Sequence, residues 1–235
     1  MEKVEKNGNI EIRKEAEKER NAWIRRSLCL YAVTDPHFSN DDEEFLAQIE
    51  AAIQGGASMV QLREKELEDA AFLRRACKVR ELTEKYKVPL IINDKIEVAL
   101  ACGADGVHMG QGDMPAEEAR KRLGDSRILG VTAKTVEQAQ AAYRAGADYL
   151  GSGAMFGSVT KQDAKYMNFE TLQAICQSVP IPVVAIGGIN KDNVEQLAGS
   201  GMAGAAVVSG IFGKRTCEHV RAAARDLREK VEKIL

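Results

Sequence analysis

The stretch QGGASMVQ, residues 54–61, contains a joint that recurs along the chain and decides its fold. Two glycines end a segment with helical periodicity, small residues follow, and an apolar run of strand length begins. Because glycine adopts a left-handed helix cap at little steric cost, this order predicts a helix, a turn and a strand. Similar joints occur at 101–109 (ACGADGVHM), 144–152 (RAGADYLGS) and 199–207 (GSGMAGAAV). Their recurrence indicates one supersecondary unit that is repeated.

Eight strand-length runs alternate with helical patterns after residue 27. The predicted strands are 28–35, 59–64, 89–94, 106–110, 128–132, 149–153, 183–188 and 204–210. The helical patterns between them include 42–54, 69–86, 135–145 and 191–198. Strands that alternate with helices pair in parallel, because a parallel crossover needs a helix-length connection. We therefore expect an α/β fold, a (β/α)8 TIM barrel. A doubly wound open sheet is the alternative, but it normally has fewer strands and a GxGxxG motif after the first one.

The first 27 residues differ from the rest of the chain. The segment EIRKEAEKER, residues 11–20, mixes charges of both signs at helical spacing, which is typical of a solvated helix. Trp23 and Ile24 could anchor such a helix to the barrel, and a frayed extension is the alternative. We therefore divide the chain into a short charged N-terminal helical extension, 1–27, and a catalytic barrel domain, 28–235.

The composition argues against several classes of function. The 235-residue chain has a formal net charge of -2 and a pI near 6.0, which disfavours general nucleic-acid binding. Its apolar runs are too short to span a bilayer, and its charged start lacks the apolar core of a signal peptide. Five single cysteines without a CxxC pair indicate reduced thiols. We therefore expect a cytoplasmic protein that binds neither nucleic acid nor membrane, and the sequence is compatible with a homo-oligomer.

Polar side chains alternate at the end of the second predicted strand. In MVQLREKELED, residues 59–69, Gln61, Arg63 and Lys65 come at every second position and so share one face. In a barrel that face is the interior, and Lys65 lies beyond the strand, at the carboxyl-end mouth where barrel active sites sit. An exposed edge strand is the alternative, but unpaired charge is costly on a central strand that is buried on both faces. We therefore predict that these side chains are functional.

Two carboxylates follow the third and fourth predicted strands. Asp94 comes directly after Asn93 at the end of the third strand, and Asp113 follows the fourth. Magnesium takes one or two carboxylates and keeps its other positions for water and phosphate oxygens, so this pair suits Mg²⁺. Either aspartate alone is as well explained by a helix cap or a turn. Together with the cations near the mouth, the pair indicates a diphosphate ligand.

Small residues follow the last two predicted strands. Gly188 ends the Gly-Gly pair after the seventh strand, and Val208 and Ser209 end the eighth. Barrels often bind a phosphate there through backbone N–H groups, although a plain tight turn gives the same pattern. His108 lies within a strand, where a core histidine with satisfied hydrogen bonds is favoured over a catalytic base. Without an evident general base, we infer chemistry driven by a leaving group and a metal.

Seven ordered segments resemble the thiamine-phosphate synthase family, over about residues 28–213. They are LYAVTD (30–35), VQLREK (60–65), PLIIND (89–94), GADGVHMGQGDMP (103–115), ILGVTA (128–133), GADYLGSGAMFGSVTK (146–161) and VVAIGGI (183–189). The resemblance implies a barrel-shaped transferase that joins 4-amino-2-methyl-5-hydroxymethylpyrimidine diphosphate to 4-methyl-5-(2-phosphooxyethyl)thiazole. Thiamine phosphate and pyrophosphate would form by a Mg²⁺-assisted dissociative substitution, in which the thiazole nitrogen attacks a carbocation-like methylene.

The resemblance also implies roles for individual residues. The residues expected on the pyrimidine diphosphate are Gln61, Arg63, Lys65, Asn93 and Lys161. Those expected on the thiazole phosphate are Ser158, Thr160, Gly188, Val208 and Ser209. Asp94 and Asp113 would bind Mg²⁺, and Thr132, where the family commonly has serine, would lie near the reacting methylene and contribute to substrate binding. The expected catalytic residues are Arg63, Lys65, Thr132 and Lys161.

Some positions depart from the family pattern, and two other functions stay open. Gly157 and Ser158 replace a proline and a threonine of the usual loop, and Gly112 stands where an acidic residue is frequent. One alternative is a thiazole tautomerase, which shares the fold but uses a histidine where Lys134 and Thr135 follow the fifth strand here. The other is a non-catalytic barrel that binds a phosphorylated metabolite.

Overall fold

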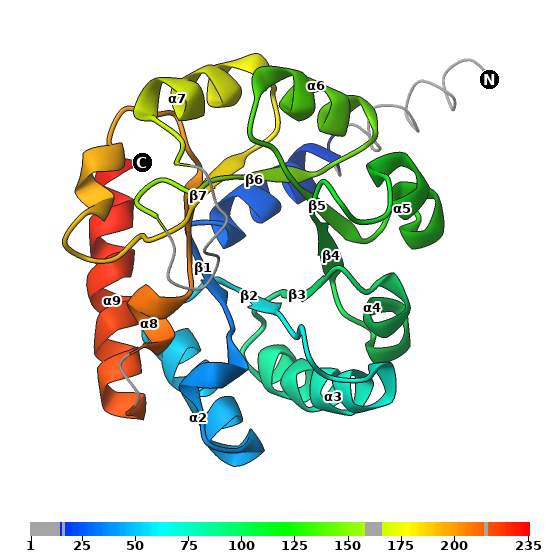
Figure 1. Ribbon diagram of the computed structural model, residues 1–235, viewed down its shortest axis with the longest axis vertical. Coiled ribbons are helices and arrows are strands. Elements are labelled where there is room, and N and C mark those ends of the chain that lie inside the picture. Colours follow the sequence, from blue (N-terminus) through cyan, green and yellow to red (C-terminus); the bar gives the residue numbers. More distant parts are fainter. Residues whose placement is uncertain (1–14, 16, 158–165, 214–215) are drawn as a thin grey trace, which may run out of the picture.

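The computed structural model describes residues 15, 17–157, 166–213 and 216–235, and within them eight parallel strands form one closed barrel (Figure 1). The strands are β1 (Leu30–Val33), β2 (Met59–Leu62), β3 (Leu90–Asn93), β4 (Gly106–Met109), β5 (Ile128–Thr132), β6 (Tyr149–Gly153), β7 (Val183–Ile186) and β8 (Gly204–Val207). Each strand pairs with its neighbours in sequence, and β1 pairs with β8 to close the ring. The predicted (β/α)8 barrel is confirmed, because an open sheet would leave its two end strands unpaired.

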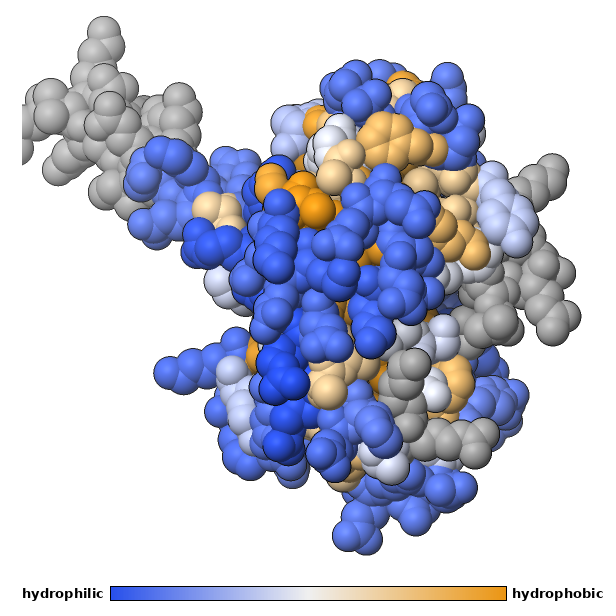
Figure 2. Space-filling view, turned by 90° about the vertical axis from the view of Figure 1, so that its left-hand side faces the viewer, coloured by the Kyte–Doolittle hydropathy of each residue, from blue (hydrophilic) through white to orange (hydrophobic). Residues whose placement is uncertain are grey.

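Helices surround the strands on the outside of the barrel (Figure 1). They are α2 (Asp42–Gln54), α3 (Asp69–Lys85), α4 (Ile96–Cys102), α5 (Ala116–Leu123), α6 (Val136–Arg144), α7 (Phe169–Ser178), α8 (Ser209–Phe212) and α9 (Cys217–Ile234). Two short 3-10 helices are η1 (Pro36–Phe38) and η2 (Val194–Leu197). In the described residues, no helix is both long enough and apolar enough to cross a membrane. Figure 2, which faces the α9 side, shows that hydrophilic residues cover most of this surface.

Most predicted elements end within two residues of the observed bounds, and two differ by more. The helix predicted at 191–198 is only the 3-10 helix η2. Backbone groups before this helix bind a side chain instead of other backbone groups. The Asn193 side chain accepts from the Asn190 N–H at 2.9 Å and donates to the Gly188 carbonyl at 2.9 Å. Such bonds offer the backbone an alternative to helical pairing. The eighth strand ends at Val207 rather than residue 210, since Ser209 already begins α8.

The recurring joints have the same hydrogen bonds at two places. Asp105 precedes β4 and accepts from the Leu90 N–H at 2.8 Å, while Asp148 precedes β6 and accepts from the Leu129 N–H at 2.8 Å. Each carboxylate also binds an arginine from a helix, Arg80 of α3 for the first and Arg120 of α5 for the second, both at 2.6 Å. The repeated Gly-Ala-Asp sequence therefore ties helix, strand and neighbouring strand together at the amino end of the barrel.

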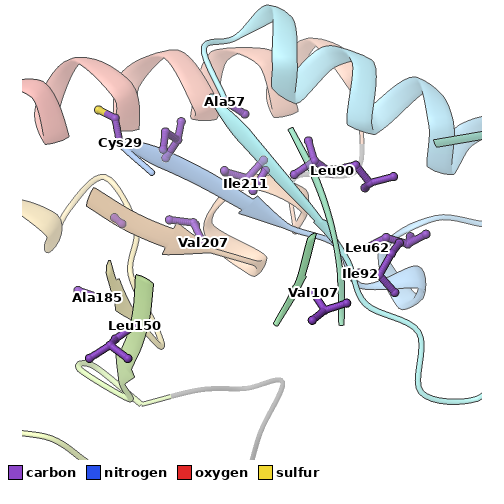
Figure 3. Packing of buried hydrophobic residues seen from close by; sticks show 14 of the residues in the cluster. Cys29, Ala57, Leu62, Leu90, Ile92, Val107, Leu150, Ala185, Val207 and Ile211 are labelled. Atoms are coloured by element: carbon purple, nitrogen blue, oxygen red, sulfur yellow. The ribbon is translucent and has the colours of Figure 1, made fainter. Parts of the chain in front are cut away.

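Two hydrophobic layers lie on the two sides of the strand ring. Alternation along each strand sends one set of side chains outward against the helices, and Figure 3 shows Leu62, Leu90, Val107 and others in this outer layer. The other set points into the barrel and includes Met59 and Ile91. All of these side chains are fully buried. Side chains thus fill the middle of the barrel, and a cavity lies at the carboxyl ends of the strands.

A helix over residues 17–27 closes the amino end of the barrel. Ile24 is fully buried and belongs to the inner layer, whereas Trp23 stays 38% exposed. Arg20 donates to Asp148 Oδ1 at 2.5 Å and to the Arg127 carbonyl at 3.2 Å. Ile24 is therefore an anchor, as predicted, and the bonds of Arg20 also attach the helix to the barrel. The boundary between segments 1–27 and 28–235 stays a prediction.

Candidate functional site

A cavity at the carboxyl ends of the strands receives residues from every strand of the described barrel. The residues of this mouth cavity include Tyr31, Val33, Gln61, Arg63, Asn93, His108, Thr132, Lys134, Gly151, Gly153, Ile186, Gly187, Gly188, Ala206, Val208 and Ser209. Barrel active sites lie at this face, where loops and strand ends converge. Seven of the predicted site residues therefore border one cavity: Gln61, Arg63, Asn93, Thr132, Gly188, Val208 and Ser209.

The end of β2 places its alternating polar residues toward the mouth. Gln61 is 5% exposed and Arg63 borders the cavity beyond it. The Arg63 N–H donates to Thr34 Oγ1 at 3.0 Å, which fixes the strand exit against the end of β1. Lys65, one step further, is half-exposed, does not line the cavity and binds the carboxylate of Asp94. The predicted inner face is thus confirmed for Gln61 and Arg63, whereas Lys65 lies at the rim beside the predicted metal site.

Glu64 points the opposite way and holds this exit from outside. Its side chain is buried and accepts from Arg75 Nη1 at 2.8 Å. Arg75 also binds Asp42 of α2, and its guanidinium lies 4.9 Å from the centre of the Phe45 ring. Burial raises the pKa of the Glu64 carboxyl, and the neighbouring Arg75 opposes that effect. The charged residues on either side of Glu64 are therefore attached to a fixed segment.

The two predicted metal ligands meet at the rim. Burial raises the pKa of Asp94, Lys65 lowers it, and the adjacent carboxyl of Asp113 raises it further. Asp113 is held by the Gly110 N–H, which donates to its Oδ2 at 2.7 Å. Two carboxylates this close repel each other when both are ionised, so a divalent cation between them would be favourable. In the described part of the chain no group of three or more His, Cys, Asp or Glu could hold a metal. The donor set therefore suits a hard cation that keeps water or phosphate ligands.

The backbone at Asp94 is unusual. Its φ is +63°, in the left-handed region, and its N–H donates to the His108 carbonyl at 2.9 Å. Aspartate tolerates this conformation better than most residues, but it still carries a local cost. Because the chain turns here, the carboxylate leaves the line of β3 and points toward the β4 loop.

A hydrogen-bonded chain forms the floor of the mouth cavity. Gln61 Nε2 donates to the Tyr31 hydroxyl at 2.7 Å, and Tyr31 and Tyr149 share a bond of 2.8 Å. Tyr149 contacts His108 Nδ1 at 3.0 Å, and His108 Nε2 contacts Thr132 Oγ1 at 3.0 Å. The prediction of a histidine with satisfied hydrogen bonds is confirmed. His108 nevertheless also borders the cavity, so it is not a core residue alone.

Two glycines after β7 let the backbone pack closely against the segment that follows β6. Gly187 and Gly188 have φ of +100° and +67°, and a Cβ at 188 would lie 2.2 Å from the Gly157 carbonyl oxygen. Only glycine fits there without displacing the loop. Val208 and Ser209 border the same part of the cavity. The predicted residues Ser158, Thr160 and Lys161 lie outside the described residues.

Lys134 and Tyr31 border the cavity but were not predicted to be site residues. Lys134 borders the cavity two positions after Thr132, the same spacing that identified Arg63 after Gln61. From the sequence, Lys134 was noted only as a residue that stands in place of a histidine. Tyr149, which is fully buried in the hydrogen-bonded chain, was not predicted either, although alternation along the strands places both tyrosines inside the barrel.

The chain is similar to thiamine-phosphate synthases over most of its length. Residues 30–211 match the family model described as thiamine monophosphate synthase. Thiamine-phosphate synthase 2 of Streptococcus pneumoniae serotype 4 is 46% identical over 211 residues, 90% of this chain and 99% of that one. The thiamine-phosphate synthase of Methanobrevibacter smithii is 51% identical over 79% of this chain and 88% of its own. The solved thiamine phosphate pyrophosphorylase of Pyrococcus furiosus has a TM-score of 0.81 and 38% identity, over 90% of this chain and 99% of that one.

Proposed function

We propose, from the premise that this chain belongs to the thiamine monophosphate synthase family, that its mouth cavity binds both substrates of thiamine-phosphate formation. The chain is accordingly a transferase, a thiamine-phosphate synthase. Its reaction joins the aminopyrimidine methyl diphosphate to the thiazole phosphate and releases pyrophosphate. The observation that carries the proposal is that a guanidinium, an amide and a glycine-lined backbone from different strands border one cavity.

The diphosphate end of the first substrate would lie between β2 and β3. Arg63 borders the cavity, Lys65 stands at the rim, and Asn93 lies on the next strand. A diphosphate carries more charge than one cation neutralises, so separate positive groups around it are appropriate. Lys161 is proposed to assist from the loop after β6.

The carboxylates of Asp94 and Asp113 are the proposed holders of Mg²⁺. Their adjacency and the oxygen donors they provide fit this ion, which binds few carboxylates and retains other oxygen ligands. When bound, the ion supplies positive charge that stabilises a departing diphosphate. Lys65 contacts Asp94 directly, so its positive charge would help the ion to neutralise the carboxylates and the diphosphate.

The thiazole phosphate would lie on the opposite part of the mouth. Gly188 brings the backbone close to the cavity, and Val208 and Ser209 lie beside it. Barrels commonly bind phosphate at the ends of their last two strands. Ser158 and Thr160 are the proposed hydroxyl contacts from the loop after β6. The two phosphate-binding regions would hold the substrates with their reacting ends toward Thr132.

The proposed chemistry needs no protein nucleophile. Arg63 and Lys65 would offset the charge that accumulates on the departing diphosphate, and Thr132 would lie beside the reacting methylene. The aminopyrimidine can delocalise positive charge, so the carbon–oxygen bond would break before the thiazole nitrogen attacks. Positioning of both substrates can supply about 7–11 kcal/mol of barrier reduction at best. The alternative tautomerase would need a histidine after β5, where Lys134 borders the cavity instead.

Two further predictions concern the setting of the enzyme. The five cysteines are all unpaired thiols, which supports the proposed cytoplasmic location. A homo-oligomer remains compatible with the barrel, and sedimentation analysis of the purified chain would measure its state.

One assay tests the proposed function. The purified protein is incubated with the pyrimidine diphosphate, the thiazole phosphate and Mg²⁺, and pyrophosphate release is measured with each component omitted in turn. We expect release that requires both substrates and the metal. Binding without release would favour a metabolite-binding barrel, and conversion of a thiazole carboxylate phosphate without pyrophosphate release would favour the tautomerase.

A further inference from the structure

We propose that Tyr31, Tyr149 and His108 are positioning residues, which direct the hydroxyl hydrogen of Thr132 into the mouth cavity. The inference rests on the proposed function, because it assigns Thr132 a donor role toward the departing diphosphate. Its basis is the floor chain of hydrogen bonds from Gln61 to Thr132.

Four members of the floor chain border the cavity, and the fifth, Tyr149, is closed to solvent. Gln61 and Thr132 line the cavity on β2 and β5, and the two tyrosines between them are 1% and 0% exposed. The ring of Tyr149 lies over Gly130, where an added Cβ would come within 2.1 Å of the ring. The tyrosine therefore has little room to turn, and the order of bonds along the chain is fixed by packing.

The donors of the floor chain can be assigned one after another. Gln61 Nε2 can only donate, so the Tyr31 oxygen accepts and its own hydrogen is directed to Tyr149. Tyr149 then donates to His108 Nδ1.

The remaining bond follows from the tautomer of the histidine. A neutral imidazole that accepts at Nδ1 carries its hydrogen on Nε2, which donates to Thr132 Oγ1. Thr132 then keeps its own hydrogen for the cavity.

The reverse order is unfavourable. If Thr132 donated to His108, and His108 Nδ1 donated to Tyr149, the Tyr31 oxygen would accept from both Tyr149 and Gln61. Its own hydrogen would then be buried without an acceptor among the described residues. A buried donor without a partner is costly. Burial also raises the pKa of both tyrosines above the usual value, so both remain protonated donors at neutral pH.

The direction of donation along the floor chain matters for the reaction. In the assigned order Thr132 presents a hydrogen to an anion, and in the reverse order it presents only lone pairs. A donor that is already aimed at the developing charge needs no reorganisation during the reaction. The tyrosines and the histidine would thus act on the reaction through Thr132.

The first test measures the tautomer directly. Nitrogen NMR of ¹⁵N-histidine-labelled protein, with the His108 signals assigned by a His108→Asn variant, reports which ring nitrogen carries hydrogen. We expect hydrogen on Nε2 and an accepting Nδ1 in the wild type, and a loss of this preference in Tyr149→Phe. Hydrogen on Nδ1 in the wild type overturns the proposal, whatever the activity.

The second test is a double-mutant cycle in single-turnover kinetics. We expect Tyr149→Phe to slow pyrophosphate release roughly tenfold with little change in the half-saturating concentration of the pyrimidine diphosphate. In a Thr132→Val background the same change should have no further effect, while Thr132→Ser should retain most of the wild-type rate. Equal losses in both backgrounds would mean that Tyr149 acts independently of Thr132 and would overturn the proposal.

Matched controls separate this inference from folding and from the proposed function. Tyr143→Phe alters a 45% exposed tyrosine on α6 and should leave rate and stability unchanged. Tyr31→Phe interrupts the chain one bond earlier and replaces Tyr149→Phe if that variant does not fold. If the wild type itself releases no pyrophosphate, the proposed function fails, whereas the NMR experiment still decides the direction of the chain.

Discussion

The two ends of the barrel use aspartate in opposite ways. At the amino end Asp105 and Asp148 each accept from a strand N–H and from an arginine, so their charges are satisfied within the fold. At the carboxyl end Asp94 lies beside Asp113, and its backbone is in the left-handed region. The amino end is thus held by ion pairs, whereas two like charges lie together at the carboxyl end. We call these the stable end and, because it carries the proposed site, the reactive end.

Arg63→Ala should produce the largest effect, and only at the reactive end. We expect pyrophosphate release to fall roughly 10²–10³-fold, because one donor to a developing charge is lost. The free energy of unfolding should change by no more than about 0.5 kcal/mol, since the side chain borders a cavity. Arg74→Ala on the exposed side of α3 is the control. A destabilised Arg63→Ala protein with normal activity per folded molecule would assign Arg63 a structural role.

Ile24→Ala should give the converse result at the stable end. Removing a fully buried side chain should lower the free energy of unfolding by about 3 kcal/mol, measured by chemical denaturation. Activity per folded molecule should be unchanged, because Ile24 lies at the other end of the barrel. Trp23→Ala, at a 38% exposed position of the same helix, should cost less. Equal losses for the two variants would contradict the assignment of Ile24 as the anchor.

Asp94→Asn should shift the Mg²⁺ dependence of the reaction. Since one of two proposed carboxylate ligands loses its charge, the half-saturating metal concentration should rise on the order of tenfold or more. Asp125→Asn, an exposed substitution before β5, is the matched control. An identical magnesium titration for Asp94→Asn and the wild type would remove Asp94 from the metal site.

Glu64→Gln should give the smallest effect, visible in the pH dependence of stability. Burial raises the pKa of Glu64 above its usual 4.5, so the folded state binds this proton more tightly than the unfolded state. The stability that this group contributes is therefore present below pH 4.5 and is lost as the pH rises through the raised value.

Denaturation at several pH values measures the consequence. The stability of Glu64→Gln relative to the wild type should increase as the pH rises above 4.5 and then level off. A relative stability that falls over this range would mean that the bond to Arg75 outweighs burial.

The barrel could be predicted because its signals are local. The glycine joints, the strand-length runs and the helix at 42–54 each depend on residues close in sequence, and the structure places them as expected. The helix expected at 191–198 failed because side-chain bonds from Asn193 replace helical pairing there. The contacts of Arg20 were not predicted, because its partners Asp148 and Arg127 lie more than 100 positions away in the sequence.

The site was predicted only in part, for a different physical reason. Alternation placed Gln61 and Arg63 on the inner face correctly, but it could not show that Lys65 would turn to Asp94 at the rim. The floor chain was not predicted because its bonds join five different strands, and its two tyrosines, Tyr31 and Tyr149, are 118 positions apart in the sequence. Such contacts form only when the ring of strands closes. Periodicity in the sequence predicts that the fold is a barrel, but it does not predict which side chains meet inside it.

The left-handed backbone at Asp94 also limits how this position can be studied. Alanine there would remove the carboxylate and add a conformational penalty of about 1–2 kcal/mol, so a routine alanine scan would mix two unrelated losses. Asparagine keeps the shape and removes the charge, while glycine relieves the torsion and removes the side chain. Comparing the melting temperatures of Asp94→Asn, Asp94→Gly and Asp94→Ala would separate the cost of the left-handed backbone from the effect of losing the carboxylate.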